Sequence, residues 1–126
     1  MGLKEEQAIA NLDFAFAERR IKGSYGKHLK IELDVESFIS DLEAILCSDA
    51  RGAFIISSAI IRVCDEALGK EAFEQKAITK IILKNQAAGS RAISVKGGAL
   101  IMACAFASND DRYQEFEATE ELESQL

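Results

Sequence analysis

Residues 92–106, AISVKGGALIMACAF, decide the fold class of this chain. Two β-rich runs, 92–96 and 99–106, are joined by Gly97 and Gly98. A glycine pair favours a two-residue hairpin turn, because both central turn positions can adopt positive φ. A two-residue turn also fixes the register of the strands. The predicted pairs are Val95 with Leu100 and Ile93 with Met102 on the buried face, and Ser94 with Ile101 and Ala92 with Ala103 on the other.

The second run of this hairpin has an alternative interpretation. Residues 99–103, ALIMA, are also good helix formers, so residues 99–106 could form a helix instead. We expect a strand, because a glycine pair starts a helix poorly.

Two further strands are expected upstream of the hairpin. Residues 28–33 alternate strictly between apolar and polar side chains, which indicates a half-buried strand. Residues 78–84, ITKIILK, are β-rich and are followed by the turn-forming stretch 85–90. The four strands together predict a small antiparallel sheet.

Helical periodicity fills the rest of the chain. The first helix carries two apolar stripes, which is typical of a helix buried in the core or shared with a partner subunit. Asp34 is expected to cap the second helix, Ser48-Asp49 to separate the second from the third, and Gly69 to end the third. Asn109-Asp110 is expected to cap an acidic C-terminal helix. The predicted helices span 3–22, 35–47, 50–68 and 70–77, with the acidic helix after them. This pattern predicts an α+β fold whose helices pack on one face of the sheet.

The charge is concentrated at the C-terminal end. The chain has 126 residues, a length suited to one domain, and a formal net charge of −6. Residues 110–126 hold seven acids and one arginine, which accounts for all of that net charge. We therefore expect a single α+β domain over 1–109 and an acidic helical tail over 110–126.

The composition favours a soluble cytoplasmic protein. The N-terminal sequence lacks the pattern of a signal peptide, and the longest apolar stretch, 53–64, is shorter than the ~20 residues of a membrane span. Three cysteines without a CxxC pair indicate free thiols in a reducing compartment. With a single histidine, we expect no metal site, no cofactor and no catalytic set.

The solvent face of the predicted sheet is the first candidate site. Strand alternation puts lysines and apolar side chains there together. Such a face could bind a protein partner or an acidic ligand, whereas lysines alone could simply protect the sheet edges from pairing. The candidate residues are Lys30, Lys80, Ile82, Lys84, Lys96, Ile101 and Ala103.

A second candidate is the loop with a G-x-x-G spacing. Gly23 and Gly26 lie beside Lys27 and His28, so backbone amides in this loop could hold an anion. The alternative is a helix C-cap glycine followed by a turn glycine.

These features favour a small non-enzymatic interaction domain of the accessory, adaptor, chaperone or immunity type, acting as a homodimer. One alternative is a protein that binds nucleic acid or another anion and is autoregulated by the acidic tail, although the net negative charge disfavours nucleic acid. A small enzyme of unidentified class is a further alternative.

Overall fold

The hairpin forms as the sequence predicts. The structure is a computed structural model that describes residues 2–126. In it, β3 (Ala92–Lys96) pairs antiparallel with β4 (Ala99–Cys104) in the predicted register. Gly97 and Gly98 have φ values of 55° and 81°, the positive values that this turn requires. The strand assignment is therefore confirmed, although β4 ends two residues before Phe106.

The sheet is mixed rather than wholly antiparallel. Its strand order is β1-β2-β4-β3, where β1 is Lys30–Leu33 and β2 is Lys80–Asn85. β2 runs parallel to both β1 and β4, and only the hairpin is antiparallel. Helices connect β1 to β2, and such a crossover returns the chain in the same direction. β3 takes the outer edge, so β4 lies beside β2 and parallel to it.

The first predicted helix is two helices. α1 is Leu3–Ala10 and α2 is Ala15–Tyr25, so the prediction of one helix over 3–22 is wrong. The Asp13 carboxylate accepts a hydrogen bond from the Ala15 backbone N–H at 2.9 Å, which favours a new helix start there. α2 also continues past Gly23 and ends at Gly26, whose φ is 90°.

The predicted helix over 35–47 is also divided. Val35–Phe38 is a short 3₁₀ helix, and α3 is Leu42–Ser48. Ser40 lies between them with a φ of 63°, which is incompatible with a continuous helix. The N-cap is Asp41 rather than Asp34, since its carboxylate accepts from the Ala44 N–H at 3.0 Å.

The helix break expected at Ser48-Asp49 does not occur. α3 passes through a π-helical turn, Asp49–Ala53, into α4 (Phe54–Cys64). The Ser48 hydroxyl donates back to the Ile45 carbonyl at 2.7 Å instead of capping a new helix. The resulting helix, Leu42–Cys64, is long and apolar enough to cross a membrane, but 56% of its most apolar window is buried inside the protein, as in the core helix of a soluble protein.

α5 (Ala67–Gln75) begins earlier than the predicted helix over 70–77. Gly69 lies inside α5 and does not end the helix before it. A Cβ atom at Gly69 would clash with the Val63 carbonyl oxygen. The glycine therefore allows α5 to pack tightly against the end of α4.

The acidic C-terminal helix is present as α6 (Glu115–Ser124). Its N-cap is Gln114 rather than Asn109-Asp110, and Gln114 forms a capping box with Glu117. α6 packs against α4, and its Ala118 and Leu122 are fully buried.

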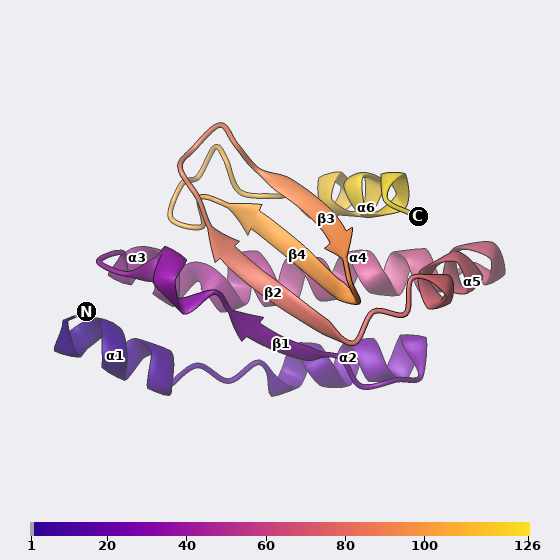
Figure 1. The fold of residues 1–126 in the computed structure, drawn as a ribbon, viewed down its shortest axis with the longest axis horizontal. Helices are drawn as coiled ribbons and strands as arrows, with labels where there is room; N and C mark the ends of the chain where they lie inside the picture. The colour runs from indigo at the N-terminus through magenta and orange to yellow at the C-terminus, as the bar shows by residue number, and fades with distance from the viewer. Residues whose placement is uncertain (1) are drawn as a thin grey trace.

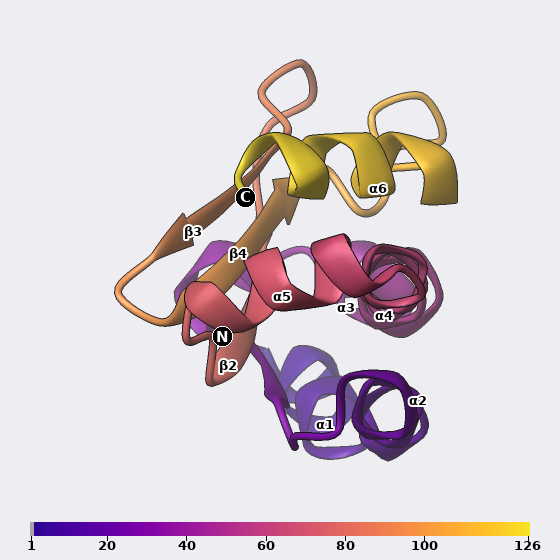
Figure 2. The ribbon, with the colours of Figure 1, turned by 90° about the vertical axis from the view of Figure 1, so that its right-hand side faces the viewer.

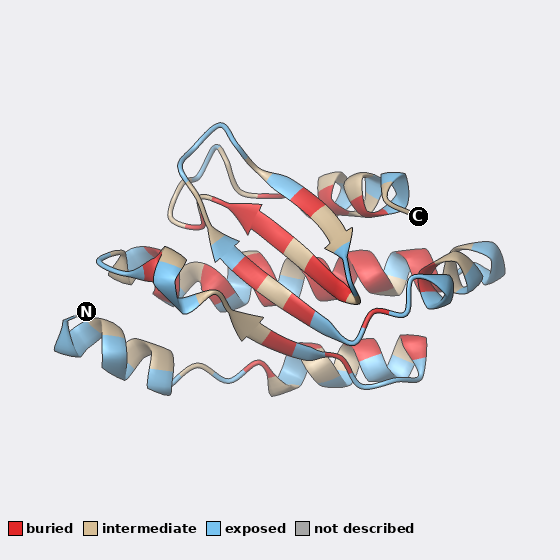
Figure 3. Ribbon diagram, in the orientation of Figure 1, coloured by how far each residue is buried: buried red, intermediate tan, exposed pale blue. Residues whose placement is uncertain are grey.

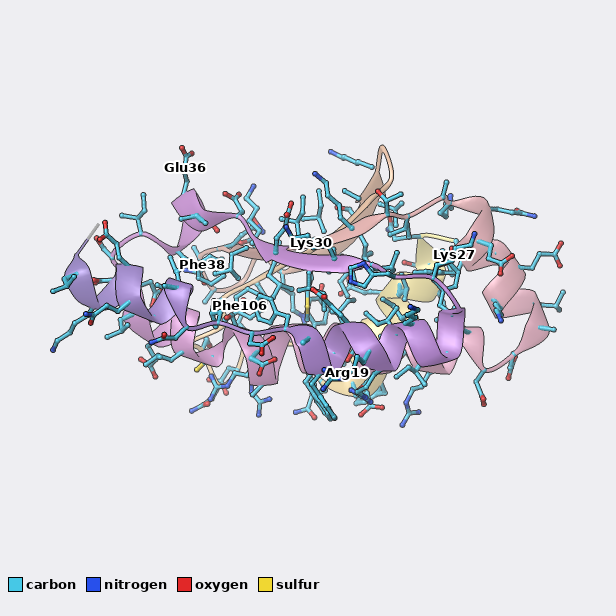
Figure 4. The ribbon with its side chains drawn as sticks, turned by 90° about the horizontal axis from the view of Figure 1, so that it is seen from below. Arg19, Lys27, Lys30, Glu36, Phe38 and Phe106 are labelled. Atoms are coloured by element: carbon cyan, nitrogen blue, oxygen red, sulfur yellow. The ribbon has the colours of Figure 1, made fainter. Side chains whose placement is uncertain are left out.

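All of these elements form one small α+β domain with two layers. Figures 1 and 2 show α2, α4 and α6 on the same side of the sheet, with α4 between the other two. The buried residues concentrate between the sheet and this helical layer (Figure 3). Phe38 and Phe106 stack in this core with ring centroids 5.7 Å apart (Figure 4).

Candidate functional site

The sheet has one face that no helix covers within residues 2–126 (Figures 1 and 2). We call it the open face. The strand register arranges its side chains in three rows across β1, β2, β4 and β3. The first row is Lys30, Lys80, Ala99 and Lys96; the second is Glu32, Ile82, Ile101 and Ser94; the third is Lys84, Ala103 and Ala92, with Asp34, the first residue after β1, beside it.

All seven residues of the predicted face lie on the open face. The register brings Ile82 beside Ile101 at the centre, where both side chains are half-buried. Ala103, two residues after Ile101 on β4, is buried and lines a depression of this face. The four lysines surround this apolar centre and are exposed. Figure 4 shows Lys30 on the strand side of the molecule, whereas Arg19 lies on α2 in the helical layer.

The open face is hollowed between its rows. A depression of about 490 Å³ lies over the centre of the sheet, and small side chains leave this space. Its lining consists of Glu32, Leu33, Asp34, Ile82, Lys84, Gln86, Ala92, Ser94, Lys96, Ile101 and Ala103.

The open face is positively charged, in contrast to the rest of the chain. It carries four lysines and two acids, a net charge of +2 in a chain whose net charge is −6. Lys80 is the one open-face lysine with a carboxylate within ion-pair distance in the described structure, since its Nζ lies 3.8 Å from Glu32. The acidic helix α6 packs in the helical layer and leaves the open face uncovered. The surface is therefore open to an external acidic group.

The predicted anion loop has a different local structure. Gly23 belongs to the last turn of α2, and the Gly26 N–H donates to the Lys22 carbonyl as a helix C-cap. Lys27 lies over the Tyr25 ring, with its Nζ 5.6 Å from the ring centroid. His28 Nε2 lies 3.1 Å from a Glu18 carboxylate oxygen. The nearby Glu18 carboxylate is unfavourable for an anion, and a role in anion binding remains a prediction.

The same glutamate protects the edge of the sheet. Glu18 Oε2 accepts a hydrogen bond at 3.0 Å from the Ile31 N–H, which points outward from the edge strand β1. This contact occupies a backbone group that another strand could otherwise pair with.

The buried cysteines and Asp111 could in principle carry chemistry, but their surroundings give them structural roles. Burial raises the pKa of Cys64, and it raises the pKa of Cys104 to about 12, so neither thiol is activated as a nucleophile. All three cysteines are free. The two Asp111 carboxylate oxygens accept backbone N–H groups from Gly89 at 2.7 Å and from Ala105 at 3.2 Å. Among residues 2–126 no cluster of three potential metal ligands occurs.

Sequence reasoning missed the residue that holds α6 in place. The Arg91 guanidinium lies 4.7 Å from the Tyr113 ring centroid and donates to both oxygens of Glu117, at 3.0 and 3.3 Å. The hydrogen bond from Arg91 is the main reason that the pKa of Glu117 is lowered. The sequence showed only that Arg91 precedes a strand, because its partners are more than twenty positions away.

Sequence reasoning also missed an aromatic patch on the outer surface of the helices. Phe16 on α2 is 61% exposed and Phe54 on α4 is 41% exposed. The Arg20 guanidinium carbon lies 4.6 Å from the Phe54 ring centroid and 5.9 Å from that of Phe16. Its nitrogens also donate to the hydroxyls of Ser57 and Ser58, so the guanidinium is held in position. We call Phe16, Arg20 and Phe54 the aromatic patch.

No family model, no curated protein and no solved structure matches this chain.

Proposed function

We propose that this protein is a small non-enzymatic interaction domain of the accessory, adaptor, chaperone or immunity type, whose open face binds a protein partner. The observation that carries this proposal is a sheet face without a covering helix, with Ile82 and Ile101 half-buried at its centre. Apolar side chains surrounded by polar ones are the usual anatomy of a binding surface. The free cysteines favour a reducing compartment such as the cytoplasm.

The variant Ile101→Lys tests this proposal, because it puts a charge at the centre of the open face. The matched control is Leu68→Lys on α5, where the native side chain is 81% exposed and remote from the open face. We expect cross-linking in cell extract to capture partners with the wild-type protein and with Leu68→Lys, and to lose them with Ile101→Lys. Equal capture by all three proteins would contradict the proposal.

We further propose that the protein forms a homodimer through the aromatic patch. Exposed phenylalanines and an ordered arginine are of the residue types that are enriched at protein interfaces. The charged residues near the patch in the sequence sum to zero with Arg20, since there are three acids and three arginines: Asp13, Glu18, Asp49, Arg19, Arg20 and Arg51. Two copies can therefore meet there without repulsion between like charges.

Light scattering over a range of concentrations tests the dimer. We expect the wild-type protein and Ile101→Lys to have the dimer mass, and Phe16→Ser to have the monomer mass. A monomeric wild-type protein would overturn the homodimer but would leave partner binding at the open face standing.

Binding of a small anion or of nucleic acid is a second candidate function for the open face. It is favoured by the first row, in which Lys80 and Lys96 flank the small Ala99 and Lys30 lies beside Lys80. Titration with inorganic phosphate and with a single-stranded oligonucleotide at low salt tests it. The absence of binding to either would exclude this candidate.

A further inference from the structure

The rows of the open face contain information about the chemistry of the partner. Lysines occupy three of the four positions in the first row and one in the third, whereas the acids Glu32 and Asp34 lie only on the β1 side. The apolar centre, Ile82 and Ile101, lies in the second row, between the lysines of the first row and Lys84 of the third. A partner must therefore place apolar atoms over the centre and negative charge over the lysines.

A second copy of the same face does not meet this requirement. A two-fold axis parallel to the strands would exchange β1 with β3 and place Lys30 opposite Lys96 of the second copy. An axis across the strands would exchange the first and third rows and place Lys80 opposite Lys84 of the second copy. The second arrangement also brings Lys30 opposite Asp34. The attraction within this pair at best offsets the repulsion between Lys80 and Lys84. Like charges facing each other in a dry interface are unfavourable.

An acidic protein segment that carries a large apolar side chain meets both parts of this requirement. The depression of about 490 Å³ can take a large apolar side chain against Ile82 and Ile101. The small side chains of Ala92 and Ala103 line this depression and leave space for the side chain to approach the sheet. Carboxylates next to this anchor would reach Lys80 and Lys96 on one side and Lys84 on the other, and the lysine side chains are long and exposed.

We propose that the open face binds an acidic protein segment in which a large apolar side chain is flanked by carboxylates. This inference rests on the proposed function and specifies the partner for the same surface. Charge attraction increases the rate of association and excludes basic partners, while the apolar anchor provides most of the affinity.

Selection from a display library of short random peptides tests the proposal without knowledge of the natural partner. The full-length protein is the target, and peptides that also bind Ile101→Lys are removed. We expect the remaining peptides to be rich in Asp and Glu around one Leu, Ile, Phe or Trp.

The outcomes separate the inference from the function on which it rests. Peptides that depend on Ile101 but carry no acidic bias would overturn the inference and leave the open face as a binding surface. The absence of any peptide that depends on Ile101 would overturn both. Selected peptides that match the sequence of α6 would identify the segment as that of a second copy, and the acidic chemistry would still hold.

Charge reversal then tests the assignment to the lysines. For the best selected peptide, labelled with a fluorophore, we expect Lys80→Glu and Lys96→Glu each to weaken binding by about tenfold or more, equivalent to about 1.4 kcal/mol. The matched control is Lys4→Glu on α1, which changes the net charge equally but lies outside the open face and should leave the affinity within about twofold. Equal weakening by all three variants would show that only the net charge matters and would overturn the site assignment.

Discussion

The same four strands present two very different faces. On the face covered by helices, Ile81, Leu83, Leu100 and Met102 are all fully buried. On the open face, their neighbours Ile82 and Ile101 are half-buried, and alanines and lysines occupy most other positions. Because successive residues of a strand point to opposite faces, a shift of one residue separates a core position from a surface position.

This difference shows which side chains are needed for folding and which are available for binding. The covered face is filled by large aliphatic side chains, and the hydrophobic effect from their burial stabilises the fold. The open face combines a small apolar centre with four lysines that repel one another and do little for stability. A fold that needed only solubility would not require two isoleucines side by side at the centre of that face.

Matched truncations on β4 should give the largest effect and provide the most direct test of the comparison. Leu100→Ala removes a fully buried side chain and should lower the free energy of unfolding by about 2–5 kcal/mol, because it leaves a cavity. Ile101→Ala changes the adjacent residue, which is half-buried, and should lower the free energy of unfolding by about 1 kcal/mol. Urea denaturation of the two variants measures the difference. Equal losses would mean that the open face is part of the core.

Local patterns were sufficient to predict the hairpin and the fold class. The turn geometry of Gly97 and Gly98 fixed a register between strands that are adjacent in sequence, and the structure confirms it. The parallel pairing of β1 and β2 was not predictable in the same way, because forty-six residues separate Leu33 from Lys80 and no local signal specifies their direction. The helix breaks at Asp13 and Ser40 were missed because apolar periodicity continues through both positions.

The candidate face was predictable to the extent that it depends on strand alternation. Alternation within β2, β3 and β4 is a property of the sequence alone, and it is enough to place Ile82, Lys96 and Ile101 on one side. The rows across the sheet could not be derived, because they depend on the strand order and the long-range register. The contacts of Arg91 and the exposure of Phe16 were missed for the same reason, since both depend on segments remote in the sequence.

Single charge pairs on the two sides of the sheet should change the free energy of unfolding less than the truncations on β4. Glu117 is bound by Arg91 through two hydrogen bonds on the helix side, and Glu117→Gln should lower the free energy of unfolding by about 1 kcal/mol near pH 7. Because its pKa is lowered in the folded state, this contribution is complete above the ordinary pKa of a glutamate. It is lost as the pH falls through the lowered value.

Urea denaturation of the wild-type protein and Glu117→Gln from about pH 7 to about pH 3 measures this loss. The two unfolding free energies should converge at the acidic end. The control is Glu120→Gln, which changes an exposed glutamate of the same helix and should have little effect at any pH. A difference that persists at low pH would assign the stabilisation to packing rather than to charge.

The smallest expected effect belongs to the ion pair on the open face. Lys80 and Glu32 are 3.8 Å apart, and their side chains are 48% and 39% exposed. Exposed pairs of this kind couple weakly, so a double-mutant cycle of Lys80→Ala and Glu32→Ala should give a coupling energy below about 0.5 kcal/mol. A coupling above about 1 kcal/mol would mean that the ion pair contributes to stability, and charge reversal at Lys80 would then report on stability as well as binding. With a weak coupling, the Lys80 amine can exchange Glu32 for a carboxylate of the partner at little cost to stability. Binding of an acidic segment requires this property.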